Sequence, residues 1–366
     1  MKVMPLFGTR PEGIKMAPLV KELKKHPEIT CVFVNTAQHR EMLDQVLDLF
    51  DLKPDYDLDM MKEKLPLPKM FAKMVEKISD VLESEKPDLV LVHGDTLTTS
   101  AGALAAFYNQ IPVGHVEAGL RTYDITSPFP EEANRQITGV VADIHFAATQ
   151  TNKKSLIREG KKEDIIHVVG NSVIDALVDV ANRPFEFQEP LKTILNSGLK
   201  TILMTTHRRE NLSQLGNVYK AVNRILNEHD DVQIIFPVHK NPAVRNELSQ
   251  HLKESDRVHI IEPQDYTVFA QLMKNAHFIL TDSGGIQEEA PALGKPVLVA
   301  RNNTERPEGV EAGTLRLCGT EEESVYAAIK QLLTDDDMYQ TMSGAKNPYG
   351  IGDTSQQIVD IILKKY

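Results

Sequence analysis

The sequence predicts an α/β protein made of two doubly wound, Rossmann-like domains that face a central crevice. Short, fully apolar runs such as residues 3–7 alternate with amphipathic stretches such as residues 13–25. This alternation is typical of parallel sheets with helices on both faces. The alternation begins again near residue 201, after residues 182–197, which lack strand character. A length of 366 residues also suits two domains, at roughly 150 residues each.

The individual elements follow from the apolar runs and their spacing. In the first half we expect helices at residues 13–25 and 97–108, and strands at 3–7, 30–36, 88–93, 112–117, 144–148 and 166–169. In the second half we expect a helix at 214–227 and strands at 201–205, 232–238, 258–261, 278–281 and 296–298. Residues 59–69 mix Met, Lys and Pro and are interpreted as a mobile loop. The predicted domains are residues 1–170 and 171–352.

Composition and charge exclude several classes of partner. The formal net charge is −11, from 52 acidic and 41 basic residues, and a negative field disfavours nucleic acid and anionic membrane surfaces. No apolar run approaches the roughly 20 residues of a membrane span. Cys31 and Cys318 form no metal-binding or disulfide pattern, which favours a reducing cytoplasm. An acidic chain of this kind binds anions only in locally basic pockets.

The first strand runs into a turn, residues 8–13, that opens a helix. Glycine permits close approach of the backbone, helix N-terminal amides favour an anion, and Arg10 and Lys15 add positive charge. We therefore expect a phosphate or diphosphate there. The alternative is a plain strand-to-helix turn.

Three carboxylates, Asp95, Glu117 and Glu131, follow the ends of successive predicted elements. Each has a structural alternative: Asp95 as a helix cap, Glu117 paired with Arg121, and Glu131 paired with Arg135 four residues later. If they face one site, repulsion and burial are expected to raise the pKa of at least one, which suits acid–base chemistry.

In the second half, three strand ends predict anion binding. His207, Arg208 and Arg209 follow the strand at 201–205, and a second basic end carries His239. Ser283, Gly284 and Gly285 precede a helix, where a hydroxyl and free amides can hold phosphate. Glu289 lies six residues after Ser283 and can accept both hydroxyls of a ribose, or else complement the helix dipole.

At these residues the sequence resembles the non-hydrolysing UDP-N-acetylglucosamine 2-epimerases, essentially from end to end. The matching stretches are residues 7–12, 114–121, 127–136, 207–211, 282–289 and 304–308. The family has the two-domain fold of the B-type glycosyltransferases, in which the last helix, here residues 353–366, crosses back to the first domain. Gly13 and Tyr123 depart from the family pattern, and Tyr123 could alter access near the sugar.

The resemblance implies a role for each candidate residue. Asp95, Glu117 and Glu131 would surround the sugar, organised by Arg135, and His207 would assist departure of the diphosphate. Arg10, Lys15 and Arg306 are further implied substrate contacts. Gln264 and Phe269 would hold uracil, Glu289 would bind the ribose, and phosphate would be bound by Ser283, Gly284 and Gly285. Activation by substrate at a second site is also a family property, for which Gln38, His39, Arg208, Arg209 and His239 are the candidates.

The implied reaction interconverts UDP-GlcNAc and UDP-ManNAc through loss and re-addition of UDP, with no cofactor and no metal. The resemblance further implies a homodimer and a product used for surface polysaccharides or teichoic acid linkages. Three alternatives stay open: a hydrolysing epimerase, a glycosyltransferase of the same fold, and a non-catalytic nucleotide-sugar sensor.

Overall fold

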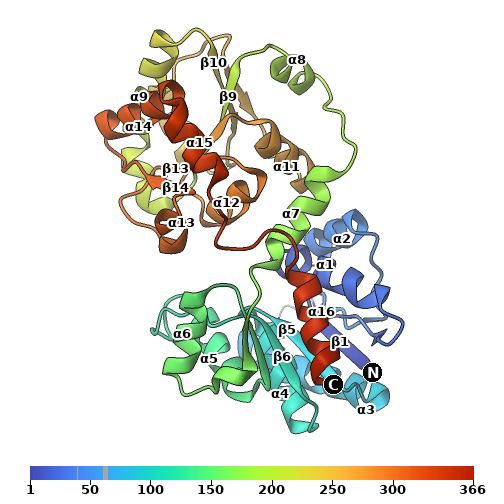
Figure 1. Cartoon of the computed structure of the whole chain (residues 1–366). Helices are drawn as coiled ribbons and strands as arrows, with labels where there is room; N and C mark the ends of the chain where they lie inside the picture. The colour runs from blue at the N-terminus through green and yellow to red at the C-terminus, as the bar shows by residue number, and fades with distance from the viewer. Residues whose placement is uncertain (39, 61–64) are drawn as a thin grey trace. The chain divides into compact units, whose positions relative to one another are not determined.

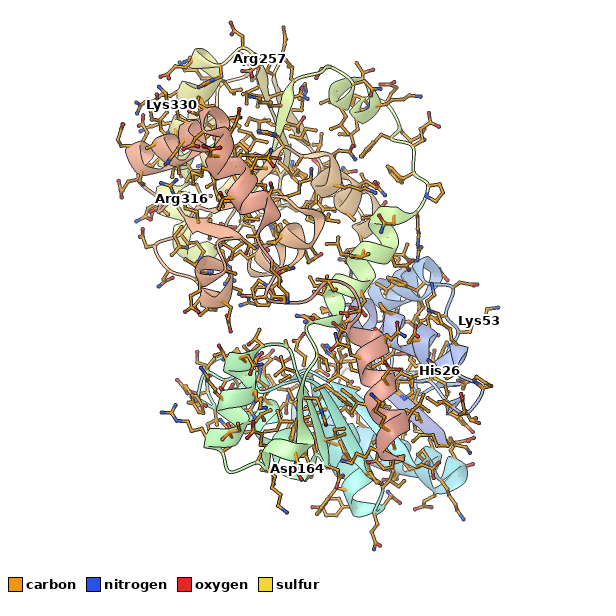
Figure 2. All side chains as sticks on the ribbon, viewed as in Figure 1. His26, Lys53, Asp164, Arg257, Arg316 and Lys330 are labelled. Atoms are coloured by element: carbon orange, nitrogen blue, oxygen red, sulfur yellow. The ribbon has the colours of Figure 1, made fainter. Side chains whose placement is uncertain are left out.

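The chain forms two compact units. The computed structural model describes residues 1–38, 40–60 and 65–366, without the side chains of residues 41 and 209–211. The first unit comprises Met1–Ala176 together with Tyr349–Tyr366, and the second comprises Leu177–Pro348. Within each unit the strands lie at the centre with helices on their faces (Figure 1), and side chains fill the space between helices and sheet (Figure 2). In the described part of the chain, no helix is long and apolar enough to cross a membrane.

The sheet of the first unit is parallel in every pairing that the structure describes, with the order β4-β3-β1-β5-β6-β7-β8, and β2 pairs with β1. The strands are β1 (Lys2–Phe7), β2 (Thr30–Cys31), β3 (Val34–Asn35), β4 (Tyr56–Asp57), β5 (Leu89–His93), β6 (Val113–Ala118), β7 (Ile144–Ala147) and β8 (Ile166–Val168). Its central strands are buried on both faces, which explains their continuous apolar sequence.

Helices cover both faces of this sheet. They are α1 (Arg10–Lys25), α2 (Arg40–Leu49), α3 (Leu67–Glu85), α4 (Leu97–Tyr108), α5 (Glu131–Val141), α6 (Gln150–Arg158), α7 (Ser172–Asn182), which continues into the second unit, and α16 (Thr354–Lys365). Helix α4 packs with α3 and α5, and α1 packs with α2 and α16. The C-terminal helix is anchored at its start, because the buried Asp175 carboxylate accepts hydrogen bonds from the amides of Thr354 (3.2 Å) and Ser355 (2.6 Å).

The second unit repeats the design with the strand order β11-β10-β9-β12-β13-β14, again parallel throughout. Its strands are β9 (Lys200–Thr205), β10 (Val232–Pro237), β11 (Val258–Ile261), β12 (Phe278–Thr281), β13 (Val297–Val299) and β14 (Leu315–Leu317). Its helices are α8 (Leu191–Leu195), α9 (Leu215–Glu228), α10 (Pro242–His251), α11 (Tyr266–Asn275), α12 (Gly284–Glu289), α13 (Pro307–Glu311), α14 (Glu322–Thr334) and α15 (Asp336–Gly344).

In both sheets the strand order reverses at the first strand of the unit, so that later strands are added on both of its sides. Strand β1 lies between β3 and β5, and β9 lies between β10 and β12. In open parallel sheets this reversal leaves room for a ligand at the carboxyl ends of the strands. Each unit is therefore expected to bind its ligand at the residues that follow these central strands, which are β1 and β5 in the first unit and β9 and β12 in the second.

The structure corrects several boundaries. The strand predicted at 30–36 is interrupted, because the Phe33 amide bonds the Asp55 carboxylate (2.8 Å) rather than a strand. Strands β4 and β14 were not predicted. Of the predicted loop 59–69, residues 61–64 lie outside the described residues and residues 67–69 begin α3. The segment 182–197 contains the short helix α8.

Candidate active site

The turn after β1 is held by its own glutamate. Glu12, buried in the first turn of α1, accepts the amides of Gly8 (3.1 Å) and Thr9 (2.8 Å), while Thr9 caps the helix. Gly8 is required by close approach, since a Cβ there would lie 1.7 Å from the Thr36 hydroxyl. Glu12 therefore occupies these two amides, and Arg10 remains as the positive group at the head of α1.

Glu117 is aimed by an irregularity in its strand. The register of β6 against β7 shifts between Val116 and Ala118, and Glu117 between them has a φ of 60°. A bulge of this kind redirects a side chain, and left-handed backbone in a non-glycine residue is concentrated at functional sites. Glu117 thereby leaves the alternation of the strand. The alternative pairing with Arg121 is wrong, because Arg121 binds Glu159 (2.7 and 3.0 Å).

Two basic groups meet the Glu117 carboxylate. Lys15 Nζ forms an ion pair with Glu117 Oε2, and His93 Nε2 lies 3.5 Å from the same oxygen. Burial raises the pKa of Glu117, but Lys15 and His93 outweigh it and hold the pKa well below the ordinary value of 4.5. The expected raised pKa is thus wrong for this carboxylate. Glu117 is therefore ionised at neutral pH.

Asp95, which follows β5, forms an ion pair with Arg135 on α5. Arg135 Nη2 lies 2.5 Å from Asp95 Oδ2, and Nη1 lies 3.1 Å from Glu132. Thr96, not Asp95, caps α4, so the capping alternative for Asp95 is wrong. Arg135 binds the carboxylate three residues earlier, and Glu131 Oε2 is a buried atom with no hydrogen-bond partner.

These acidic groups lie at one edge of the first sheet. Strands β5 and β6 are neighbours, paired from Val90↔Val113 to His93↔Val116. Gly94 lies next to Glu117, since a Cβ on Gly94 would be 3.9 Å from Glu117 Oε1. Asp95 directly follows Gly94. The structure therefore brings Lys15, Asp95, Glu117 and Arg135 into one cluster.

In the second unit, Asp282 fixes the turn that carries His207. The Asp282 side chain is fully buried and accepts the amides of His207 (3.0 Å) and Arg208 (3.0 Å). His207 stacks on His239 with ring centroids 5.7 Å apart. With Arg208 they line a hollow of about 950 Å³. Burial lowers the pKa of His207, and the effects of His239 and Arg208 act in the same direction, against Asp282.

The glycine pair at the start of α12 faces two arginines. A Cβ on Gly284 would lie 3.4 Å from Arg208 Nη2 and 3.4 Å from Arg306 Cζ, so both guanidinium groups approach this turn. Arg306 Nε also donates to Glu288 (2.7 Å). The Ser283 side chain makes no cap hydrogen bond to α12. Two positive groups beside a glycine-lined helix start form an anion-binding arrangement.

The residues predicted to bind ribose and uracil lie on α12 (Glu289), on α11 (Phe269) and just before α11 (Gln264). Tyr266, its first residue, donates to Glu289 Oε2 (3.5 Å). A Cβ on Gly285 would lie 3.4 Å from the other Glu289 oxygen. Gln264 lines a hollow of about 420 Å³ with Phe185, Phe187 and Val268. Phe269 is half-buried on α11 and is not part of that lining.

The predicted second-site residues are divided between the units. Gln38, in the first unit, accepts from the Thr98 hydroxyl (3.2 Å). Arg208 and His239 lie together in the second unit. His39 and the Arg209 side chain lie outside the described residues. Among the described residues, no cluster of three His, Cys, Asp or Glu side chains is arranged to hold a metal ion.

Four structural partners were missed from the sequence: Glu12, His93, Glu132 and Asp282. All four stand inside motifs that were singled out, next to residues assigned a role. One signal was available, because Glu132 is three residues before Arg135, and side chains at this spacing are in contact on a helix. The others depend on contacts between separate strand ends.

Two parallel α/β units with charged groups at their strand ends place the chain in the class of GT-B-like, nucleotide-sugar enzymes. The family model for UDP-N-acetylglucosamine 2-epimerase matches residues 21–363. The Bacillus subtilis UDP-N-acetylglucosamine 2-epimerase is 56% identical, over 100% of this chain and 96% of its own. The chain belongs to the UDP-N-acetylglucosamine 2-epimerase family, whose members are isomerases.

Solved structures agree in fold. A crystal structure of a UDP-N-acetylglucosamine 2-epimerase is 55% identical with a TM-score of 0.92, covering 99% of this chain and 95% of its own. The Neisseria meningitidis enzyme, crystallised with UDP-GlcNAc, is 48% identical with a TM-score of 0.83, covering 100% of both chains. A putative enzyme from Listeria monocytogenes is 46% identical with a TM-score of 0.93, covering 99% of this chain and 95% of its own.

Proposed function

We propose that this chain interconverts UDP-GlcNAc and UDP-ManNAc by eliminating UDP and adding it back. The observation that carries the proposal is the Glu117–Lys15 ion pair beside the Asp95–Arg135 pair. It places two carboxylates at neighbouring strand ends of one sheet. An epimerisation at C2 needs two acid–base groups, one for each face of the sugar.

The chemistry begins with the C1–O bond. The hydrogen at C2 is not acidic, because no carbonyl lies beside it. When the C1–O bond breaks and its electrons leave with UDP, positive charge at C1 acidifies that hydrogen. A carboxylate then takes the C2 proton and a 2-acetamidoglucal remains. Delivery of a proton to the other face of C2, with return of UDP to C1, gives the epimer.

Each group in the first unit has a task in this scheme. Glu117 is the acceptor of the first proton, since Lys15 and His93 keep it ionised. Asp95 acts on the opposite face, held by Arg135. Glu131, whose Oε2 is buried without a partner, faces the sugar and accepts its polar hydrogens. Arg10 adds positive charge for the substrate.

The second unit binds the nucleotide in this proposal. His207 and Arg306, with the turn at Ser283, Gly284 and Gly285, stabilise the departing diphosphate. Glu289 accepts the ribose hydroxyls. Gln264 and Phe269 hold the uracil.

The scheme needs no cofactor, because the proton removed at C2 is replaced by another and no net redox change occurs. We further propose that the hollow of His207, Arg208 and His239 contributes to activation by substrate. Cytoplasmic location and use of the product for surface polysaccharides are also inferred from family membership.

A homodimer is proposed from an apolar face of the first unit. Phe107 and Tyr108 at the end of α4 are 52% and 73% exposed, and Val140 on α5 is 72% exposed. Helices α4 and α5 pack together. Exposed apolar patches of this kind mark interaction surfaces. Sedimentation of the Val140→Glu variant as a monomer would support this face, and sedimentation of the wild type as a monomer would contradict it.

The reaction is tested by NMR of UDP-GlcNAc incubated with the protein in D₂O. We expect deuterium at C2 and an equilibrium of two UDP-sugars. Accumulation of free UDP would indicate a hydrolysing enzyme. A requirement for an acceptor would indicate a glycosyltransferase. Retention of hydrogen at C2 with no new sugar would leave only a binding protein.

A further inference from the structure

Glu132 lies beside residues that the proposed reaction uses, and that reaction gives it no role. Its side chain is fully buried in the first turn of α5. A buried carboxylate is tolerated only when its oxygens are hydrogen-bonded. Here each oxygen accepts two: Oε1 from the Tyr123 amide (3.1 Å) and Gln136 (3.0 Å), and Oε2 from the Thr122 amide (3.1 Å) and Arg135 (3.1 Å).

These four donors keep Glu132 ionised. Burial raises the pKa of Glu132, but the hydrogen bonds from Gln136, Thr122, Arg135 and Tyr123 together outweigh burial and lower the pKa. At neutral pH the carboxylate therefore carries no proton to give. With two donors already on each oxygen, it has little capacity to take one either.

Arg135 links Glu132 to Asp95, because its guanidinium binds both carboxylates. One terminal nitrogen of the guanidinium meets Glu132 (3.1 Å) and the other meets Asp95 Oδ2 (2.5 Å). The guanidinium is planar, so fixing one nitrogen fixes the direction of the other. Asn134 Nδ2 donates to the Asp95 carbonyl (3.0 Å) and holds its backbone. The orientation of the Asp95 carboxylate then depends on where Glu132 places Arg135.

We infer that Glu132 is a positioning residue: it fixes Arg135 so that Arg135 aims the Asp95 carboxylate at the sugar. The inference rests on the proposed epimerisation, in which Asp95 acts at C2. The same contacts would also suit a carboxylate that only braces the loop at Thr122 and Tyr123. The two roles differ in whether the effect of Glu132 passes through Arg135.

A double-mutant cycle separates the two roles. Glu132→Gln is expected to lower kcat for C2 exchange by about 100-fold, as misplacement of a reacting group does, with KM changed less than about threefold. In an Arg135→Met background, Glu132→Gln should change kcat by less than about twofold, because the path to Asp95 is already cut. A further 100-fold loss in that background would overturn the inference, as would a change confined to KM or a normal kcat for Glu132→Gln.

Glu159→Gln is the matched control. It removes another carboxylate bound to an arginine of the first unit, Arg121, and should leave kcat unchanged. If Glu132→Gln does not fold, the cycle is run with Glu132→Asp, which keeps the charge but withdraws it by one methylene. The same dependence on Arg135 is expected and the same additivity would overturn it.

The wild-type protein tests the proposed function separately. Absence of deuterium at C2 in the wild type would refute the epimerisation itself. Exchange in the wild type, combined with additive losses in the variants, would refute only the role of Glu132.

Discussion

The Thr96 hydroxyl donates a 2.6 Å hydrogen bond to Oε1 of Glu12, and this contact joins the turn after β1 to the turn after β5. Glu12 is buried, and its other oxygen accepts the amides of Gly8 and Thr9. Thr96 follows Asp95 and caps α4. The Glu12 carboxylate therefore connects the turns that follow β1 and β5, two neighbouring strands of the sheet.

Thr96→Ala should destabilise the fold by about 1–3 kcal/mol. It removes a helix cap, worth about 1 kcal/mol, and one donor to a buried carboxylate, worth about 1.5–3 kcal/mol, and the two losses overlap. Urea unfolding measures the change. Thr126→Ala removes an exposed hydroxyl that bonds Asp124 and should cost less than about 0.5 kcal/mol. Equal stability of the two variants would show that the Glu12 contact does not stabilise the turn.

Asp95→Asn and Glu117→Gln should each lower kcat by about 100- to 10,000-fold, the usual contribution of a general acid or base. Both keep the size of the side chain, so UDP should bind as tightly as to the wild type. Turnover is measured by C2 deuterium exchange and UDP affinity by calorimetry. Near-normal turnover of both variants would make the acid–base assignment wrong.

Lys15→Met should move the acid limb of the kcat profile to higher pH. Lys15 and His93 lower the pKa of Glu117 against the effect of burial, so removal of Lys15 raises it. Glu117 must be ionised to accept a proton, and a higher pKa means that this form is lost earlier as the pH falls. The pH dependence of C2 exchange checks this.

Lys153→Met is the control for that shift. Lys153 pairs with the exposed Glu163 at 2.8 Å, so its profile should match the wild type. An unchanged acid limb in Lys15→Met would show that Glu117 is not the group titrating there.

The fold was predictable because its signal is local. Strand β1 and helix α4 lie within one residue of the predicted bounds, since fully buried strands and an alanine-rich helix have strong patterns. The interruption of the strand at 30–36 was not predictable, because it depends on Asp55, more than twenty residues away.

For the site, the sequence indicated the strand ends but not the partners of each side chain. The only partner considered for Glu117 was Arg121, as the structural alternative, yet Glu117 contacts Lys15 and His93. The direction of the Glu117 side chain comes from a bulge and a left-handed backbone, and the residue type at this position predicts neither. Likewise, a phosphate was expected at the turn after β1, and the sequence did not indicate that Glu12 accepts hydrogen bonds from the amides of Gly8 and Thr9 there.

Arg306→Met should raise the Kd for UDP by about tenfold or more, since a charge-assisted hydrogen bond contributes about 1.5–3 kcal/mol. Its guanidinium lies beside Gly284 at the start of α12. Arg316→Met is the control, because Arg316 (Figure 2) bonds Gln331 instead. Calorimetric titration with UDP measures both, and equal Kd values for the two variants would remove Arg306 from the nucleotide site.

Binding of UDP should be linked to protonation of His207. Burial lowers the pKa of His207, with His239 and Arg208 acting in the same direction, so the free protein carries it neutral at pH 7. A diphosphate beside it favours the charged form and raises the pKa, so UDP should bind more tightly as the pH falls from 8 towards 6. Calorimetry in buffers of different ionisation enthalpy should show uptake of up to about one proton.

The His207→Gln variant corrects for protons that UDP itself exchanges, because UDP is common to both titrations. The difference in proton uptake between wild type and variant belongs to His207 and the groups coupled to it. If that difference is zero while the affinity falls, His207 contributes to binding only as a neutral hydrogen-bond donor. In that case the charge that stabilises the departing diphosphate must come from Arg208 and Arg306, which approach the same glycine.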